Sequence, residues 1–172
     1  PPGISFAESK RFAEIVHSPS VVAFNRRYFP LVARFKEIVG SLPPPVYVNS
    51  SFYRHNRIDS LDHDRDRRKP TFVIGTGLHM INLLEYVVGP IARVDSERFP
   101  TAREGVVGWD CRLQFEGGIP GSLRMLPCCG ASTEWLEYHT DDVSVGLLCS
   151  LYNKVDYPGR IIVQRSGAEQ EI

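Results

Sequence analysis

Several features are missing from this sequence of 172 residues, and each absence excludes a class of protein. No apolar run approaches the roughly 18–20 residues that a membrane-crossing helix needs, so we expect no membrane partner. Twenty basic and twenty acidic residues leave a formal net charge of zero, which gives no bulk attraction to nucleic acid. With 42% hydrophobic and 23% charged residues, the composition is that of an ordinary globular protein.

Cysteine is also scarce, and its spacing excludes the common metal and redox motifs. Its four residues include no C-x-x-C pair, and adjacent cysteines are poorly placed to form a disulfide with each other. The five histidines show no H-x-x-x-H spacing, so we predict no metal site. No basic segment followed by an apolar core marks a signal peptide at the first residues. We therefore expect a cytoplasmic protein with reduced cysteines in or near its core, at Cys111, Cys128, Cys129 and Cys149.

The first 25 residues have the pattern of the end of an α/β domain. Ser5–Glu8 is a capping box that starts a helix, and apolar residues follow at helical spacing. Val21–Phe24 is a continuous apolar run, which is typical of a strand buried on both faces. Helix, turn and buried strand is the rhythm of a parallel α/β sheet, but residues 1–25 are too few to be a domain of their own.

Residues 26–172 predict a second domain, of the α+β class. Periodicity and Gly or Pro punctuation predict helices over residues 28–40 and 71–88, and a strand over 46–53. The charged stretch 54–69 is interpreted as a solvated loop. Short apolar segments then recur with turn residues between them, which is typical of a mostly antiparallel sheet. The predicted strands are Val106–Phe115, Gly121–Met125, Glu134–His139, Val143–Ser150 and Ile161–Gln164.

These elements predict a large, mostly antiparallel open sheet that helices pack on one face only. The other face then needs cover, because the strands between Val106 and Cys149 carry apolar residues at many positions. We therefore expect copies of the chain to pair through this sheet as a homodimer or homotetramer.

The predicted helix that ends at Gly89 contains the residues best suited to chemistry. On a continuous α-helix, Gly75, His79, Asn82 and Tyr86 share one face, and the opposite face is apolar. Two glycines in its first turns cost roughly 1 kcal/mol each relative to alanine, which indicates a backbone that approaches a neighbour closely. A single histidine in a helix is more often structural than catalytic, and the pattern by itself leaves both roles open.

A second polar group follows the apolar run Val21–Phe24. Asn25 and Arg26 stand at the end of that predicted strand, and ligands of open α/β sheets bind outside the carboxyl ends of strands. These side chains are therefore placed to meet a cofactor or a substrate. A helix-capping asparagine beside surface arginines explains the same pattern equally well.

Together these two segments resemble the Gfo/Idh/MocA family of oxidoreductases. The run V-A-F-N-R-R-Y-F-P-L-V, residues 22–32, is similar to the family's G-F-N-R-R-F-x-P segment. The run G-T-G-L-H-M-I-N, residues 75–82, resembles its D-x-G-x-H-x-x-D helix, and residues 91–94 resemble the strand that follows. The similarity extends from Pro1 to about Leu148.

The resemblance implies a fold and a chemistry. Residues 1–25 would be the last helix and strand of a truncated Rossmann domain that binds NAD or NADP. Residues 26–172 would be a substrate-binding and oligomerisation domain, similar to the C-terminal domains of dihydrodipicolinate reductase and glyceraldehyde-phosphate dehydrogenase. The reaction would oxidise or reduce a carbinol on a sugar, an inositol or a related polyol.

The same resemblance assigns roles to five residues. His79 would be the acid/base group, because its ordinary pKa suits proton transfer near neutral pH. Asn82 and Tyr86 would bind the substrate. Asn25 and Arg26 would also contact the substrate, or the nicotinamide end of the cofactor.

Several features depart from the family's pattern. Gly75 and Asn82 stand where the family often has aspartates, and no G-x-G-x-x-G loop follows a strand in these residues. The family's catalytic lysine falls before Pro1. We therefore expect this chain by itself to bind dinucleotide poorly and to be inactive. The alternative is a non-catalytic oligomerisation or ligand-sensing module derived from the same fold.

Overall fold

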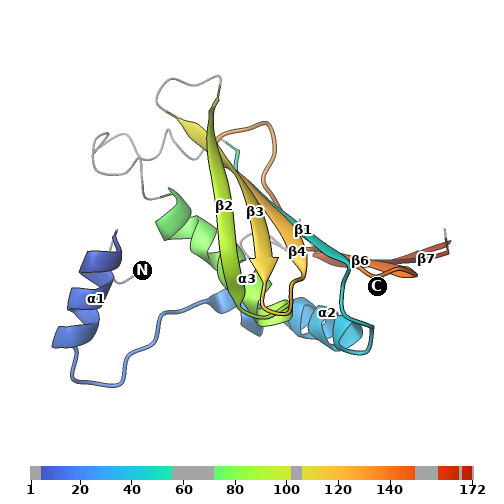
Figure 1. The fold of residues 1–172 in the computed structure, drawn as a ribbon, viewed down its shortest axis with the longest axis horizontal. Coiled ribbons are helices and arrows are strands. Elements are labelled where there is room, and N and C mark those ends of the chain that lie inside the picture. Colours follow the sequence, from blue (N-terminus) through green and yellow to red (C-terminus); the bar gives the residue numbers. More distant parts are fainter. Residues whose placement is uncertain (1–4, 56–71, 102–105, 150–158, 167, 172) are drawn as a thin grey trace.

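An eight-stranded open sheet forms the centre of the computed structural model, which describes residues 5–55, 72–101, 106–149, 159–166 and 168–171 (Figure 1). Strands β1 and β4 run parallel, and every other neighbouring pair is antiparallel, in the order β2-β3-β4-β1-β5-β6-β7-β8. The predicted mostly antiparallel open sheet is therefore confirmed. The strands are β1 Tyr47–Tyr53, β2 Ile91–Pro100, β3 Val107–Phe115, β4 Pro120–Leu126, β5 Thr133–His139, β6 Val143–Leu148, β7 Arg160–Arg165 and β8 Ala168–Glu171.

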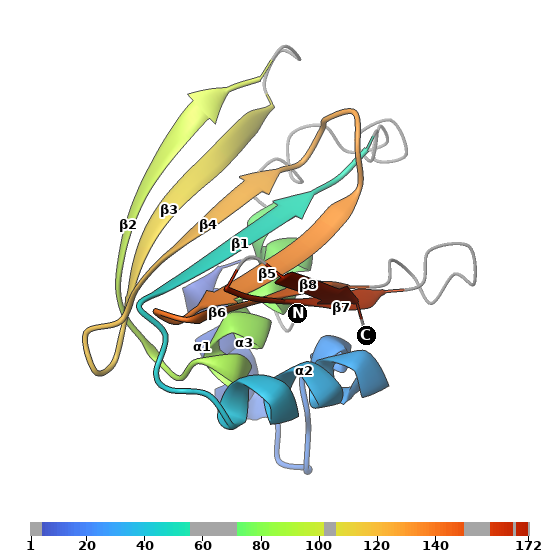
Figure 2. The ribbon, with the colours of Figure 1, turned by 90° about the vertical axis from the view of Figure 1, so that its right-hand side faces the viewer.

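Two α-helices, α2 (Pro30–Gly40) and α3 (Leu78–Val87), pack on the same face of the sheet (Figure 2). Pro30 sits in the first turn of α2, where its fixed φ favours helix initiation and its missing N–H costs nothing. The side chains between helices and sheet form one core. Its helical members are Val32, Phe35, Val39, Met80, Leu83 and Leu84, and they pack against core-facing strand residues that include Val48, Phe52, Leu123, Leu136 and Leu147.

A π-helix, η3 (Val73–Gly77), leads into α3 and brings it against the sheet. A Cβ on Gly77 would lie 2.9 Å from the Sδ atom of Met125 in β4, so the predicted close backbone approach is found at this glycine. The prediction of one continuous α-helical face from Gly75 to Tyr86 is wrong at its first member. A π-helical turn holds more residues than an α-helical turn, so Gly75 lies out of register with the α3 residues.

The N-terminal segment differs most from its prediction. Helix α1 (Phe6–Ile15) forms, and the Ser5 hydroxyl accepts the predicted capping bond from the Glu8 amide at 3.2 Å. However, no residue of α1 is buried, and Figure 1 shows this helix apart from the sheet. The expected strand at Val21–Phe24 is wrong: Val21 is 89% exposed, and the run pairs with none of the described strands. A strand needs a neighbour to accept and donate its backbone hydrogen bonds, and this segment has none there.

Other boundaries shift in smaller ways. The family resemblance implies a strand at residues 91–94, and β2 extends it to Pro100. The polar edge strand β8 has no apolar pattern in its sequence that would indicate it. A 3₁₀ turn, η1 (Asn25–Tyr28), precedes α2. Arg54 belongs to the core rather than to a solvated loop, and the predicted loop residues 56–69 lie outside the described residues.

Candidate functional site

His79 lies in the first turn of α3, where the helix meets the 3₁₀ turn η1. Its imidazole meets the Phe24 ring edge-on, with the ring centroids 6.0 Å apart. The Nδ1 atom is buried and has no hydrogen-bond partner among the described residues. A buried polar atom without a partner is unusual and needs an explanation, which a bound ligand or solvent can supply.

The surroundings of His79 favour its neutral form. Burial lowers the pKa of the imidazole most, and the positive charge of Arg26 lowers it further. The Glu134 carboxylate opposes this shift, and the positive charge of Arg54 adds a smaller decrease, so the pKa remains below its ordinary value. His79 is therefore uncharged at neutral pH and able to accept a proton.

A buried ion cluster links η1 to the sheet. The Glu134 carboxylate, in β5, points into the core with its side chain 2% exposed. Arg26 from η1 binds it through two guanidinium nitrogens, one of them Nε at 2.5 Å from Oε2. Arg54, which follows β1, donates to the same carboxylate. Two cations and one anion give this cluster a net charge of +1.

Several contacts hold the cluster in place. Burial alone would raise the pKa of Glu134, but the hydrogen bonds and charges of Arg26 and Arg54 outweigh it and leave that pKa below its ordinary value. The Arg54 guanidinium stacks over the Phe52 ring at 3.9 Å and donates to the Tyr53 carbonyl at 2.9 Å. Removing Glu134 would leave two largely buried cations without their anion, which is strongly destabilising.

The other predicted residues of α3 are tied to η1 and α2. The Asn82 side-chain oxygen accepts from Arg27 Nη2 at 2.8 Å and from Arg27 Nε at 3.0 Å. The Tyr86 ring makes two cation–π contacts: the Lys36 ammonium lies 3.6 Å from the ring centroid, and the Arg27 guanidinium lies 5.1 Å from it. These contacts fix the position of α3 relative to η1, and therefore the position of His79 relative to Arg26.

The structure brings the predicted residues Asn25, Arg26, His79, Asn82 and Tyr86 to one region, where η1 meets α3. The Asn25 side-chain oxygen accepts a hydrogen bond from Arg26 Nη1 at 3.4 Å. The other two guanidinium nitrogens of Arg26, Nε and Nη2, donate to Glu134, so all three have partners within the chain.

Sequence reasoning missed Glu134 and Arg54. The signal that could have found Glu134 is its place in β5: it shares the core-facing register of Leu136 and Tyr138, where a carboxylate needs a cationic partner.

The cysteines occupy the predicted core and near-core positions. Cys111 and Cys149 are buried, and Cys128 and Cys129 are partly buried. Burial raises the pKa of the Cys149 thiol to about 12, with a further increase from the Glu134 charge. Burial also raises the pKa of Cys111. Because the thiolate is the reactive form, neither buried cysteine is a nucleophile at neutral pH.

This difference predicts the pattern of thiol labelling. In the folded protein at pH 8 we expect iodoacetamide to modify Cys128 and Cys129 and to leave Cys149 and Cys111 unmodified. Peptide mass spectrometry after labelling, with a urea-unfolded sample as the control in which all four react, measures this. Rapid labelling of Cys149 in the folded protein would contradict the burial described above.

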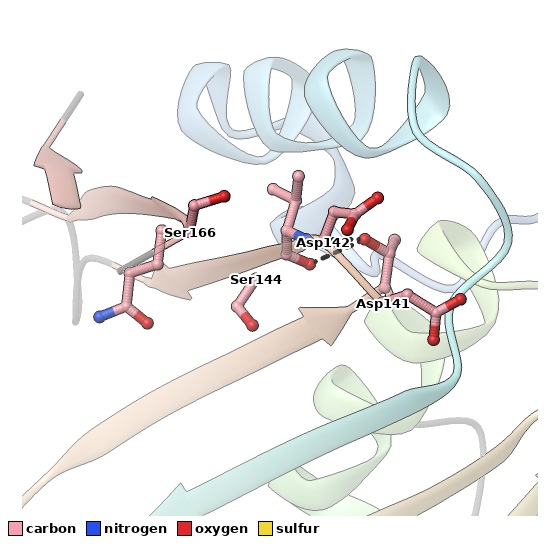
Figure 3. Close-up of a pocket in the computed structure, with 7 residues that line it drawn as sticks. Asp141, Asp142, Ser144 and Ser166 are labelled. Atoms are coloured by element: carbon pink, nitrogen blue, oxygen red, sulfur yellow. Dashed lines mark hydrogen bonds between the residues drawn. The ribbon is translucent and has the colours of Figure 1, made fainter. Parts of the chain in front are cut away.

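A separate polar hollow of about 310 Å³ lies at the turn between β5 and β6, at the opposite end of β5 from Glu134 (Figure 3). Asp141, Asp142, Ser144 and Ser166 surround it, and none of the predicted site residues lines it. Among the described residues, no three His, Cys, Asp or Glu side chains are grouped closely enough to hold a metal ion. Within the same part of the chain, every helix is too short or too polar to span a membrane.

The open sheet with helices on one face is the architecture of the C-terminal half of Gfo/Idh/MocA-type oxidoreductases. One similar structure is a levoglucosan dehydrogenase in complex with NADH and levoglucosan, at 18% identity and a TM-score of 0.73 over 96% of this chain and 51% of that one. The WlbA dehydrogenase from Bordetella pertussis, in complex with NADH and UDP-GlcNAcA, has 16% identity and a TM-score of 0.74 over 90% of this chain and 51% of its own.

A third similar structure is the UDP-N-acetylglucosamine 3-dehydrogenase GnnA from Acidithiobacillus ferrooxidans, with 10% identity and a TM-score of 0.68 over 96% of this chain and 50% of its own. The chain thus spans about half the length of these proteins, and at such identities the likeness shows the fold. No protein-family model and no curated protein matches the chain.

Proposed function

We propose that this chain is the substrate-binding and assembly half of an NAD(P)-dependent oxidoreductase that acts on a carbinol of a sugar, an inositol or a related polyol. The observation that carries this proposal is the placement of His79. Its neutral imidazole stands at the head of α3, beside η1, with a buried Nδ1 that has no partner among the described residues. The fold shared with sugar dehydrogenases that hold NADH supports the same assignment.

Proton transfer is the part of the reaction that this chain would perform. In the oxidative direction, His79 takes the proton of the carbinol hydroxyl while the carbon loses a hydride and becomes a carbonyl. In the reductive direction the protonated imidazole returns that proton to the oxygen. The nicotinamide, when bound, supplies the acceptor or donor of the hydride.

The remaining site residues would orient the reactants around the imidazole. We assign the substrate to the face of α3 that carries Asn82 and Tyr86, whose positions Arg27 fixes. Asn25 and Arg26 lie where the nicotinamide end of the cofactor or the substrate would approach. Since these 172 residues contain no glycine-rich phosphate loop, we assign most of the cofactor's binding to a Rossmann domain of which residues 1–25 are the last part.

A substrate screen tests this proposal. We would assay the complete protein with sugars, inositols and sugar acids, each with NAD and with NADP, and follow the absorbance of the reduced nicotinamide. Turnover with at least one polyol is the expected result, and the 172-residue chain assayed alone should show none. Tight nucleotide binding without turnover of any compound would instead favour the second candidate, a non-catalytic sensing or assembly module.

One observation favours that second candidate. Position 75, where the family often has an aspartate, is a glycine in the π-helix η3, and no described carboxylate accepts a hydrogen bond from the His79 Nδ1. A carboxylate in that place would orient the imidazole and stabilise its charged form. Without such a carboxylate, the imidazolium that forms when His79 accepts the carbinol proton lacks this stabilisation.

Assembly through the open sheet is the other part of the proposal. The helix-free face carries Trp135, which lies across Gly146 so closely that a Cβ there would be 2.6 Å from the ring. Two polar groups share this face. In the first, Asn49 is hydrogen-bonded to both Ser122 and Glu137. The second is the ion pair of Asp110 with Arg124. A face that mixes aromatic and paired polar groups is well suited to a second copy of itself.

Light scattering at micromolar concentration should therefore give a mass of at least twice 19.4 kDa. Tyr47→Lys places a charge on the open face, opposite His139, and should shift the mass towards one chain. Val46→Lys is the matched control, because Val46 is similarly exposed, directly precedes β1 and by alternation faces the other side. Equal masses for wild type and both variants at the single-chain value would contradict assembly through the sheet.

A further inference from the structure

Two cations at the place where α2, α3 and η1 meet have no carboxylate partner. Four of the described lysines and arginines are partly or wholly buried: Arg26, Arg27, Lys36 and Arg54. Arg26 and Arg54 share the Glu134 carboxylate. Arg27 and Lys36 form no ion pair with any described residue, and their partners are instead the uncharged side chains of Asn82 and Tyr86.

Both of these cations lie against the same ring. The Lys36 ammonium is 3.6 Å from the centroid of the Tyr86 ring, and the Arg27 guanidinium carbon is 5.1 Å from it. The two positive charges are therefore no further apart than the sum of these distances, and they repel each other. Because no described acid compensates them, an anion that approached this place would be attracted by both.

The two cations also keep donors that the chain does not use. Arg27 donates to Asn82 through Nε and Nη2, which leaves its Nη1 without a partner among the described residues. The Lys36 ammonium donates no hydrogen bond to a described residue either, and neither nitrogen is fully buried. A ligand can therefore reach both of them.

The position of these donors relates them to the proposed reaction. With about 3.6 residues per turn, His79, Asn82 and Tyr86 fall on one face of α3, at steps of about 4.5 Å and 10.5 Å from His79 along the axis. The Arg27 guanidinium binds at the first step and the Lys36 ammonium at the second. One turn of helix, about 5.4 Å, is close to the width of a hexose ring. A sugar with its carbinol at the imidazole thus points its substituent towards these cations.

Charge favours a phosphoryl group over a carboxylate as that substituent. A phosphate monoester carries about 1.5 to 2 negative charges at neutral pH, and a diphosphate diester carries one on each phosphate, whereas a carboxylate carries one in all. The phosphoryl forms therefore match the two positive charges of Arg27 and Lys36. Arginine and lysine are also the usual side-chain ligands of phosphate.

We propose that Arg27 and Lys36 form a recognition site for a phosphoryl group of the substrate, so that the sugar or polyol reaches His79 as a phosphate monoester or as a diphosphate ester. This inference rests on the proposed function for the reaction, but binding of the anion is measurable without turnover. Asn82 then has the role of holding the Arg27 guanidinium in place, and Tyr86 that of holding both cations together.

Titration calorimetry of the complete protein with inorganic phosphate and with inorganic pyrophosphate tests the site. The nicotinamide cofactor is present in excess, so that the contacts to its own phosphates are occupied. Lys36→Gln should weaken binding of the tighter anion by roughly tenfold or more, the loss expected for a charged hydrogen-bond donor. Lys36→Arg keeps the charge and should restore most of the affinity.

Arg34→Gln is the matched control for Lys36→Gln. It removes the same charge from the same helix, but Arg34 is exposed and already pairs with Glu37, so the affinity should not change. No binding of either anion by the wild type would overturn the proposal. Equal affinities in Lys36→Gln and Arg34→Gln would overturn it as well.

Substrate preference gives a readout that a structural role of Lys36 does not move. One sugar is assayed in four forms: free, as its uronic acid, as its phosphate monoester and as its nucleoside diphosphate ester. One of the two phosphoryl forms should exceed the free sugar in kcat/KM by roughly tenfold or more, mainly through KM, and this preference should disappear in Lys36→Gln. A loosened fold would instead lower kcat/KM for all four forms alike.

The four forms also separate this inference from the proposed function. The better of the two phosphoryl forms identifies the source of the phosphoryl group. Turnover in which the free sugar or its uronic acid is preferred would overturn the phosphoryl site and leave the oxidoreductase assignment standing. Anion binding that depends on Lys36, without turnover of any form, would support the site and count against that assignment.

Discussion

Replacement of His79 by alanine is expected to lower kcat in the complete protein by roughly a hundredfold or more, the contribution that a positioned general base typically makes. The imidazole is the proton acceptor of the proposed reaction, and alanine leaves the carbinol proton to solvent. The effect should fall on kcat more than on KM, because Asn82 and Tyr86 keep their contacts with Arg27. Initial rates with the best substrate of the screen measure this.

His139→Ala is the control for that variant. His139 lies at the far end of β5 from Glu134, where its Nδ1 is 2.8 Å from the Ser144 hydroxyl, and it takes no part in the proposed chemistry. Its turnover should remain near that of the wild type once equal oligomeric mass has been checked. Unchanged turnover in His79→Ala would remove His79 from the mechanism while leaving the oxidoreductase assignment in place.

Gly121→Ala is expected to be among the most destabilising single changes in the sheet, by about 2–3 kcal/mol, the upper part of the range for overpacking. Gly121 lies in β4, where the parallel strand β1 passes it. A Cβ there would lie 2.8 Å from the Val48 carbonyl oxygen and 2.9 Å from the Phe115 ring. The ring can turn aside, but the carbonyl belongs to a paired backbone and cannot move without breaking the β1–β4 ladder.

Urea unfolding, followed by tryptophan fluorescence, compares this variant with Gly40→Ala. Gly40 ends α2, and beyond its chain neighbours and the backbone of its own helix nothing lies within 4 Å of where its Cβ would stand. Alanine is also a better helix former than glycine. The free energy of unfolding should therefore stay equal or rise slightly in Gly40→Ala. Equal values for the two variants would show that the close approach of β1 to Gly121 is not maintained in solution.

Elements whose signal is local were predictable from the sequence. The apolar stripe of α2 between Pro30 and Gly40 predicts its helix, and the short segment Glu134–His139 between turn residues predicts the strand that forms as β5. The run Val21–Phe24 carries an equally clear local signal and forms no strand. An apolar run indicates that a segment can be buried, whereas strand formation also requires a partner, which a local pattern does not contain.

The candidate site shows the same limit. His79, Asn25 and Arg26 could be found because motifs carry them, and their neighbours could not. Arg54 and Glu134 are 80 residues apart, and Arg54 opens a charged stretch that is read as solvated. Glu134 and Arg54 become partners because the strand register places Glu134 beside the end of β1. That register is set by the whole sheet and cannot be read from a local pattern.

The most direct test of the central claim follows a hydride from the substrate. We would give the complete protein an oxidised nicotinamide cofactor and the polyol found by the screen, deuterated at its carbinol carbons, and analyse the reduced cofactor by mass spectrometry. The account predicts one deuterium on the nicotinamide in wild type and a greatly slowed transfer in His79→Ala. Reduced cofactor without deuterium, or no reduction with any polyol, would contradict it.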